Sequence, residues 1–238
     1  MTRRQITKFL ILRTIGNFLL LFSIYGVAAT FGPAAYYETR YRVAQARGVT
    51  FTVADAIPTP APGGQNPTQP RLPVEPGLGD VLAGQKEQVL IPKDTAYSII
   101  IPRIGASAKI FPNVDPTNEA EFSDVLQHGI AHAKGTVFPG MKGNVYLFAH
   151  SADTWWNAGR YNAIFYLLKD LQVGDDVIVY FENRRHNYTV SERVIIQPDN
   201  TDLLTNNRGT SEQLIMQTCW PPGTTFQRLI VKALPKKI

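Results

Sequence analysis

The stretch that decides the fold is LIMQTCWPPGTTFQRLIV, residues 214–231. Two apolar runs flank a loop rich in proline, glycine and threonine, which is the pattern of a β-hairpin. We expect the loop to run roughly from Trp220 to Phe226. Residues that flank such a loop are cross-strand neighbours, with Cβ atoms about 5 Å apart. The pattern therefore predicts that Cys219 and Arg228 lie close together at one rim of a sheet.

From about Pro92 onward, short β-rich runs alternate with turn residues. One of these runs, residues 96–105, is interrupted at Pro102, which cannot donate a ladder hydrogen bond. Apolar residues at helical spacing occur in residues 160–171, and residues 118–127 are a second candidate helix. Several short strands with one or two short helices predict a mostly-β barrel of about 145 residues. The other expected strands are GNVYLFAHS (143–151), DDVIVYF (175–181) and YTVSERVII (188–196).

The positive charge of the chain is concentrated at its N-terminus. The formal net charge is +5 and the sequence pI is about 9.3. Residues 1–47 hold seven Lys or Arg against Glu38 alone, whereas the rest of the chain holds 17 basic and 18 acidic residues. An electrically balanced domain lacks the basic surface expected of a nucleic-acid-binding protein. We therefore expect no nucleic-acid partner.

An uncharged apolar run accounts for this N-terminal segment. Residues 14–37 contain no charged side chain, and at about 1.5 Å per residue a helix of this length crosses an apolar layer of about 30 Å. Basic residues precede the run, so the positive-inside rule predicts a single-pass anchor with its N-terminus in the cytoplasm. The alternative is a cleaved signal peptide with residues 27–29 as the cleavage site. Both interpretations place the rest of the chain outside the cytoplasm.

A proline-rich stretch divides the remaining chain. Residues 57–79, IPTPAPGGQNPTQPRLPVEPGLG, are unsuited to helix or strand ladder and predict an extended linker that holds the next domain away from the membrane. The sequence thus predicts four parts. They are a cytoplasmic basic tail (1–13), a transmembrane anchor (14–37), a juxtamembrane segment with the Pro/Gly-rich linker (38–91) and a folded domain (92–238).

Cys219 is the only cysteine in the sequence, so it has no disulfide partner within the chain. Two interpretations stay open for it: a small buried apolar residue, or a nucleophile. A nucleophilic thiol needs a histidine to carry protons. Of the four histidines, His150 ends the apolar run NVYLFA, where a buried strand reaches the surface. His128 and His132 lie four residues apart but lack the glutamate of a zinc-protease motif, so we expect no metal site there.

Together these segments resemble the sortase family. The stretch QTCWPPGTTFQRLIV (217–231) is similar to the sortase hairpin, in which a Thr-Cys pair ends one strand and an arginine begins the next. GNVYLFAHS (143–151) resembles the strand that carries the catalytic histidine of sortases, and residues 128–144 resemble the segment that leads into it. VGDDVIVYF (173–181) resembles the strand that follows. The resemblance covers about residues 95–235 and implies a sortase-like closed β-barrel.

The resemblance also implies a catalytic mechanism. We expect no cofactor, and no metal either, because the sequence shows no His, Cys or carboxylate cluster with ligand spacing. Cys219 would attack the threonine carbonyl of an LPxTG-like sorting signal and form a thioacyl enzyme. His150 would protonate the leaving amine and deprotonate the incoming one. Arg228 would hold the substrate or the oxyanion, and Thr218 and His132 would bind the substrate.

The partners implied by the resemblance are surface proteins with a C-terminal sorting signal, and an amine of a peptidoglycan precursor or pilin as acceptor. The sortase class stays open between a housekeeping-like and a class D- or E-like member. The chain lacks a convincing pilin-type lid, because Asp115-Pro116 is followed by Thr117 and not by an aromatic residue. Two alternatives remain: another extracytoplasmic thiol hydrolase or L,D-transpeptidase, and a non-catalytic, membrane-tethered β domain.

Overall fold

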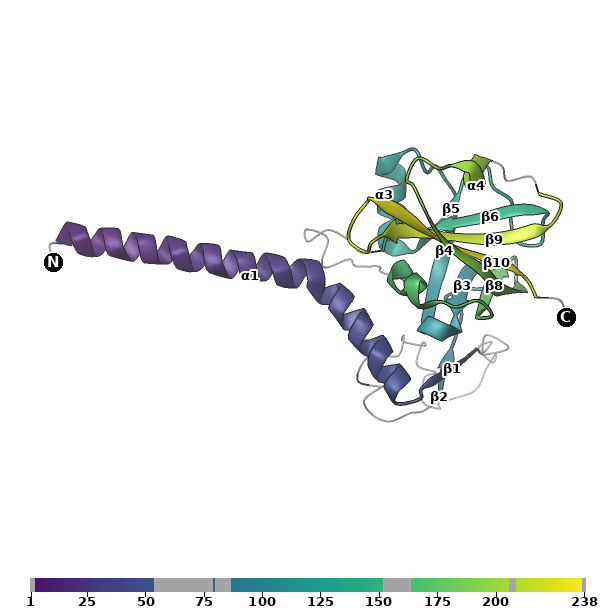
Figure 1. Ribbon diagram of the computed structural model, residues 1–238, viewed down its shortest axis with the longest axis horizontal. Helices are drawn as coiled ribbons and strands as arrows, with labels where there is room; N and C mark the ends of the chain where they lie inside the picture. The colour runs from purple at the N-terminus through teal and green to yellow at the C-terminus, as the bar shows by residue number, and fades with distance from the viewer. Residues whose placement is uncertain (1–2, 54–78, 80–86, 152–163, 206–208, 237–238) are drawn as a thin grey trace, which may run out of the picture.

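The computed structural model describes residues 3–53, 79, 87–151, 164–205 and 209–236. Its central feature is a closed barrel of strands in the order β10-β8-β7-β3-β4-β5-β6-β9 (Figure 1). The mostly-β barrel that the sequence predicts is thereby confirmed. The barrel strands are β3 (Tyr97–Ile101), β4 (Ala106–Val114), β5 (Ile130–Ala133), β6 (Gly143–Phe148), β7 (Asp176–Phe181), β8 (Arg184–Ile196), β9 (Glu212–Trp220) and β10 (Gln227–Pro235).

A few helices accompany the barrel. The helix predicted at residues 118–127 is confirmed as α3 (Glu119–His128). The prediction for residues 160–171 lies partly outside the described residues, and its described part is a 3-10 helix, η3 (Ile164–Asp170). The other described helices are α1 (Arg3–Ala46), η1 (Pro102–Ile104) and α4 (Asp202–Thr205).

The apolar runs in the sequence correspond to strands buried on both faces. Every residue of β3 and of β6 is buried, which explains why these strands read as nearly continuous apolar runs and show no period-two alternation. β3 ends where Pro102 begins η1, at the interruption that the sequence predicts. The barrel core is therefore encoded mainly by these short runs.

The strand directions give the barrel two distinct ends. β6 and β9 run parallel, and β10 returns antiparallel to β9, so the last residues of β6 and β9 lie beside the first residues of β10. β8 also ends there, because Ile196 pairs with Arg228. β7 runs antiparallel to both β8 and β3, so η1 and η3, which follow β3 and precede β7, lie at the same end. We call it the hairpin end, after the β9–β10 loop, and the opposite one the distal end.

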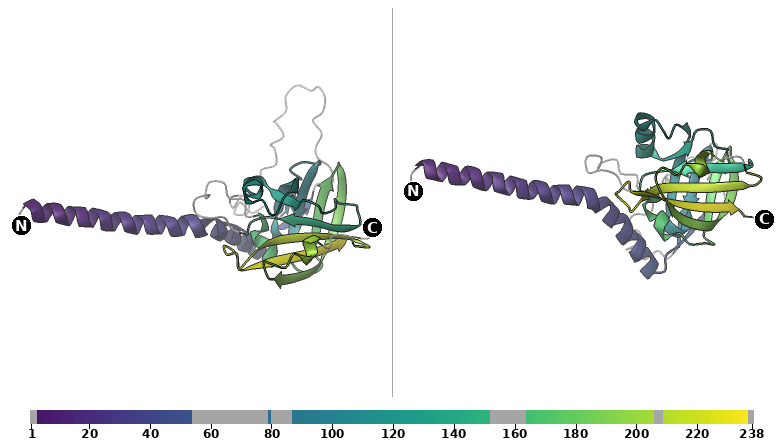
Figure 2. Two further views of the ribbon diagram at one scale, coloured as in Figure 1. Left: turned by 90° about the horizontal axis from the view of Figure 1, so that it is seen from above. Right: turned by 45° about the horizontal axis from the view of Figure 1, so that its top comes forward.

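Among the residues that the structure describes, one helix is long and apolar enough to cross a membrane. This helix is α1, whose apolar segment Arg3–Ala29 projects away from the barrel (Figures 1 and 2). It corresponds to the N-terminal apolar anchor expected from the sequence. The helix bends part-way along its length (Figure 1). Pro33, within the helix, has no N–H to donate, and proline is a usual cause of such bends.

Two short strands flank the predicted linker. After α1, strand β1 (Thr50–Val53) pairs in parallel with β2 (Glu87–Leu90) in a small second sheet. Phe51 and Val53 pack on a cluster of buried side chains from β2, β3 and β7: Leu90, Ile100, Ile178 and Tyr180. Residues 54–86 therefore begin and end at this sheet on the barrel. The predicted linker itself, residues 57–79, lies outside the described residues except for Gly79, and its role as a spacer stays a prediction.

A glycine permits the close contact between β1 and the barrel. Gly105 ends η1 with φ 61, in the left-handed region that favours glycine. A Cβ atom at this position would lie 2.8 Å from the ring of Phe51. Any larger residue would therefore force the Phe51 ring out of its place against η1.

Candidate active site

Two parallel strands carry the predicted nucleophile and the predicted base. The register of β6 and β9 includes the pair Phe148 and Gln217, and the Ala149 N–H donates to the Gln217 carbonyl at 3.2 Å. Two residues beyond this pair lie His150 and Cys219. Neighbouring strands are about 4.8 Å apart, so the same register carried forward brings His150 and Cys219 side by side at the hairpin end.

The β9–β10 hairpin places Arg228 on the other side of Cys219. The two residues are register partners, as the sequence predicts, and the connecting loop spans residues 221–226. The Nη1 group of Arg228 donates to the carbonyls of Thr225 and Gln227, both at 3.1 Å. Within the described part of the chain, its Nε and Nη2 groups make no hydrogen bond. Arg228 is thus held by its own hairpin and retains donors for a ligand beside Cys219.

A groove of about 420 Å³ brings these residues together. His150, Thr218, Cys219 and Arg228 all line it, so three predicted catalytic residues and one predicted substrate-binding residue share one cavity. α3 and the segment before it form part of its wall, and β6 and β9 contribute further side chains. Other lining residues include Thr117, Phe122, Leu126, Tyr146, Phe148 and Gln217.

Cys219 lies in surroundings that disfavour its thiolate. The residue is half-buried. Burial raises the pKa of the thiol, and the positive charge of Arg228 opposes this rise with a smaller effect. A thiol with the ordinary pKa of about 8.5 is only a few per cent ionised at neutral pH, and Cys219 is ionised less than that. A nucleophilic role for Cys219 would therefore need a base that takes the thiol proton, and His150 is the histidine that lines the groove.

Hydrogen bonds around His150 connect its segment to the hairpin. The Thr218 side chain is 4% exposed, and its hydroxyl donates to the Ala149 carbonyl at 3.0 Å. On the other side of His150, the Ser151 hydroxyl oxygen accepts a long hydrogen bond of 3.4 Å from the Gly223 N–H in the hairpin loop. Thr218 thus braces the strand end that carries His150, in addition to lining the groove.

A hydrogen-bonded pair in the groove was missed by sequence reasoning. The Tyr146 hydroxyl donates to the Gln217 side-chain oxygen, and both residues line the groove. Burial raises the pKa of Tyr146 to about 12, against the opposing charge of Arg228, so the hydroxyl keeps its proton at neutral pH. One signal could have identified Gln217: it lies two residues before Cys219, so the two side chains point to the same face of β9.

Comparison with known proteins assigns this arrangement to a family. The family model of the Sortase domain matches residues 99–236, more than half of the chain. The chain belongs to the sortase family. Among individual relatives, Sortase D of Bacillus subtilis (strain 168) is 25% identical over 121 residues, which cover 51% of this chain and 52% of that protein. The match thus spans about half the length of the curated relative.

Solved sortase structures share the fold. Sortase C-1 from Actinomyces oris is 25% identical with a TM-score of 0.51, over 61% of this chain and 77% of that chain. Sortase C1 of Streptococcus agalactiae, in the structure of its complex with MTSET, is 24% identical with a TM-score of 0.50, over 60% and 67% of the two chains. The closed barrel with few helices is therefore the sortase fold.

His132 does not lie in the groove, contrary to the substrate-binding role expected from the sortase resemblance. It is fully buried in β5, with Nε2 2.8 Å from the Thr136 hydroxyl oxygen and 3.1 Å from the Val137 carbonyl. Its ring packs edge-on against Phe138 and Tyr97. Burial lowers the pKa of His132 to about 4, so the ring is neutral at physiological pH. In this structure His132 is a core residue that does not line the groove.

The groove combines three chemical groups suited to acyl transfer. The Cys219 thiol is a nucleophile, the His150 imidazole can carry a proton, and the Arg228 guanidinium can donate hydrogen bonds to a developing negative charge. Within the described ranges, no group of three or more His, Cys, Asp or Glu residues could hold a metal ion.

Proposed function

We propose that this sortase is a membrane-anchored cysteine transpeptidase that cleaves LPxTG-like sorting signals and joins the resulting acyl group to an amine. The observation that carries the proposal is the convergence of Cys219, His150 and Arg228 on one groove. The β9–β10 hairpin pairs Cys219 with Arg228, and the parallel pairing of β6 with β9 brings His150 to the same rim. Membership of the sortase family supports the same function.

In the first half of the proposed reaction, the peptide acyl group moves to sulfur. His150 accepts the thiol proton of Cys219 while the sulfur attacks the carbonyl carbon of the threonine in the sorting signal. The peptide bond after that threonine then breaks, and His150 gives the proton to the departing amine. The products are a thioester at Cys219 and the released C-terminal peptide.

In the second half, an incoming amine attacks the thioester carbonyl. His150 accepts a proton from this amine and returns it to the departing sulfur, which regenerates the thiol of Cys219. The acceptor proposed is an amine of a peptidoglycan precursor or a pilin lysine. Water is the slow alternative acceptor when no amine is present.

Arg228 is proposed to stabilise the oxyanion that forms in both halves of the reaction. Its Nη1 group is occupied by the Thr225 and Gln227 carbonyls, which leaves Nε and Nη2 to donate to the carbonyl oxygen. A preorganised donor of this kind typically contributes about 10²–10³-fold to turnover. The same guanidinium also opposes the effect of burial on the Cys219 pKa.

The proposed location follows from α1. Its apolar segment is retained as a single-pass anchor, with the N-terminus in the cytoplasm and the barrel outside the cell membrane. Arg3, Arg4, Lys8 and Arg13 lie at the N-terminal side of the uncharged run, which supports this orientation. The substrates would then be surface proteins that reach the same side of the membrane.

The proposed function is tested by mass spectrometry of the full-length protein with a library of sorting-signal peptides and amines. We expect conjugates in which the amine replaces the residues after the threonine. The matched control is Cys219→Ala, which leaves the chain without a thiol and is expected to give neither cleavage nor conjugates. Peptides that stay intact with every amine would reject the proposal, and cleavage without any conjugate would favour a thiol hydrolase.

A further inference from the structure

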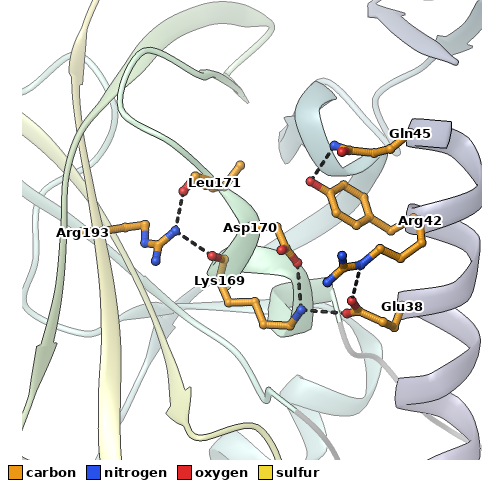
Figure 3. A network of polar contacts seen from close by, with 8 residues as sticks. Glu38, Arg42, Gln45, Lys169, Asp170, Leu171 and Arg193 are labelled. Atoms are coloured by element: carbon orange, nitrogen blue, oxygen red, sulfur yellow. Dashed lines mark hydrogen bonds and ion pairs between the residues drawn. The ribbon is translucent and has the colours of Figure 1, made fainter. Parts of the chain in front are cut away.

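The last turns of α1 are bound to the barrel by charged side chains (Figure 3). Glu38 accepts a hydrogen bond from the Lys169 Nζ at 2.7 Å, and Lys169 also donates to Asp170 at 2.9 Å. Arg42, one turn further along α1, donates to Glu38 at 2.8 Å. The hydrogen bond from Lys169 is the main cause that lowers the pKa of Glu38, so this carboxylate is charged at neutral pH. The Glu38 and Lys169 side chains are mostly shielded from solvent, unlike an ordinary surface ion pair.

Buried side chains accompany this ion pair. Tyr41 is 8% exposed and belongs to the main hydrophobic core of the barrel, and Ala44, about one turn further on, is buried as well. Arg40 is 7% exposed and donates from Nη2 to the Gly105 carbonyl at 3.2 Å. The end of α1 is therefore part of the folded domain and is not a hinge below it.

The helix is docked at the hairpin end of the barrel. Its partner Lys169 lies in η3, which Arg193 of β8 secures by donating from Nη1 to the carbonyls of Lys169 and Leu171 at 2.6 and 2.8 Å (Figure 3). Three residues further along β8, Ile196 pairs with Arg228 of the groove. The docking site and the groove thus lie at the same end of the barrel and are joined by β8.

The distance between the apolar segment and the barrel is short. The uncharged run ends at Tyr37, directly before Glu38, so the contact with the barrel begins within one helical turn of that run. A flexible linker as long as residues 54–86 would permit a separation of about 30 Å and free rotation. Because that stretch begins and ends on the barrel, the orientation of the barrel is set by α1.

We propose that the docked end of α1 holds the groove facing the membrane at short range. In Figures 1 and 2, the β9–β10 loop lies on the side of the barrel from which the N-terminal half of α1 projects, and the C-terminus lies on the opposite side. With the apolar segment in a bilayer, the membrane lies on the side of the groove.

This orientation deepens the proposed function, on which it rests for the reaction itself. A peptide anchored in the same membrane as the enzyme meets the groove at a high effective concentration. A groove that faces the bilayer at short range is matched to such a peptide, whereas a soluble peptide gains nothing from the orientation.

The single cysteine allows the orientation to be measured without any reaction. Full-length protein in liposomes is labelled at Cys219 with a small thiol-reactive fluorophore, and quenching by nitroxides on lipid headgroups is recorded. The matched control combines Cys219→Ala with Met141→Cys, which labels an exposed site beside the start of β6 at the distal end. We expect quenching to be several-fold stronger at the groove label than at the distal label. Equal quenching of the two labels would overturn the inference.

The same flexible Gly/Ser insertion at two places tests the role of docking. Placed after Tyr37, it separates the apolar segment from the docked turns, and we expect quenching at Cys219 to fall to the level of the distal label. Placed within residues 57–79, between two strands that both lie on the barrel, it is expected to change nothing. Unchanged quenching after the first insertion, or its loss after the second, would show that the docked helix does not set the orientation.

Cleavage rates give a second readout on the same variants. The insertion after Tyr37 is expected to lower cleavage of a liposome-tethered sorting-signal peptide several-fold while cleavage of the soluble peptide stays unchanged. Equal cleavage of the tethered peptide by the insertion variant and the unmodified protein would overturn the inference. Failure of the unmodified protein to cleave either peptide would instead reject the proposed transpeptidase function, and the quenching result would still stand.

Discussion

Replacement of Arg228 by lysine separates two roles that the arginine combines. Arg228 is the register partner of Cys219, and its positive charge opposes the effect of burial on the thiol pKa. Lysine keeps the charge but lacks the planar fork of donors. If Arg228 binds the substrate carbonyl oxygen, the lysine variant loses that bond while the thiol keeps most of its reactivity.

The hydrogen bonds of Arg228 set the expected magnitude. Its Nη1 group donates to two carbonyls of the hairpin at 3.1 Å, so Nε and Nη2 remain to donate to the substrate carbonyl oxygen. A lysine ammonium carries its three donors on one atom and cannot both hold the loop and reach the substrate oxygen. Loss of one oxyanion donor typically costs about 2.7–4 kcal/mol of transition-state stabilisation. We therefore expect Arg228→Lys to lower kcat/KM by roughly 10²-fold or more.

The assay compares two reactions of the same variant over a range of pH. One is kcat/KM with a sorting-signal peptide, and the other is alkylation of Cys219 by a small neutral reagent, which forms no oxyanion and is expected to change much less. Thermal unfolding serves as a control, because each lost loop hydrogen bond costs about 1 kcal/mol of stability. Near-normal turnover by the lysine variant would refute the hydrogen-bonding role and leave only the electrostatic effect of the charge.

Three further predictions concern the groove. His150→Ala is expected to lower kcat/KM by about 10²–10⁴-fold, whereas His128→Ala, an exposed change at the end of α3, should leave it unaltered; the reverse ranking would mean that the base is misassigned. Alkylation of Cys219 should accelerate with pH beyond the ordinary thiol range, because burial raises its pKa and the thiolate is the reactive form; a plateau below about pH 8 would contradict this. Activity is expected to survive a strong chelator, and a complete loss that zinc reverses would overturn the metal-free chemistry.

Local sequence patterns were sufficient to predict the hairpin. The loop residues and the apolar runs on either side are adjacent in sequence, so the pairing of Cys219 with Arg228 follows from turn chemistry alone. The proximity of His150 to the same rim depends on the parallel pairing of β6 with β9, which no local pattern encodes. His150 was identified from its residue type and its place at a strand end, and the register then brought it beside Cys219.

The missed and mistaken residues are those whose surroundings are assembled from distant segments. The burial of His132 depends on Tyr97 in β3 and on Phe138. The sequence around His132 therefore does not indicate that it is a core residue. Gln217 acquires its partner only when Tyr146 is placed opposite β9. Patterns that specify a strand or a helix do not specify which side chains from other strands will meet it.

The docking of α1 could not be predicted from the sequence for the same reason. Glu38 and Lys169 are 131 positions apart, and neither belongs to a recognisable motif. β1 and β2 have four residues each, too few for a periodic signal. The proline-rich composition of residues 57–79 predicts an extended stretch, but composition carries no information on where the two ends of such a stretch are attached.

The central claim is that Cys219 forms a thioester with the sorting signal, and the most direct measurement is the intact mass of the full-length protein after brief incubation with a cleavable peptide and no amine. We expect a mass increase equal to the peptide's acyl part up to the threonine, mapped to Cys219 and removed when an amine is added. Cys219→Ala should show neither the adduct nor cleavage. Cleavage by the unmodified protein without any adduct at Cys219, or equal cleavage by Cys219→Ala, would contradict the claim.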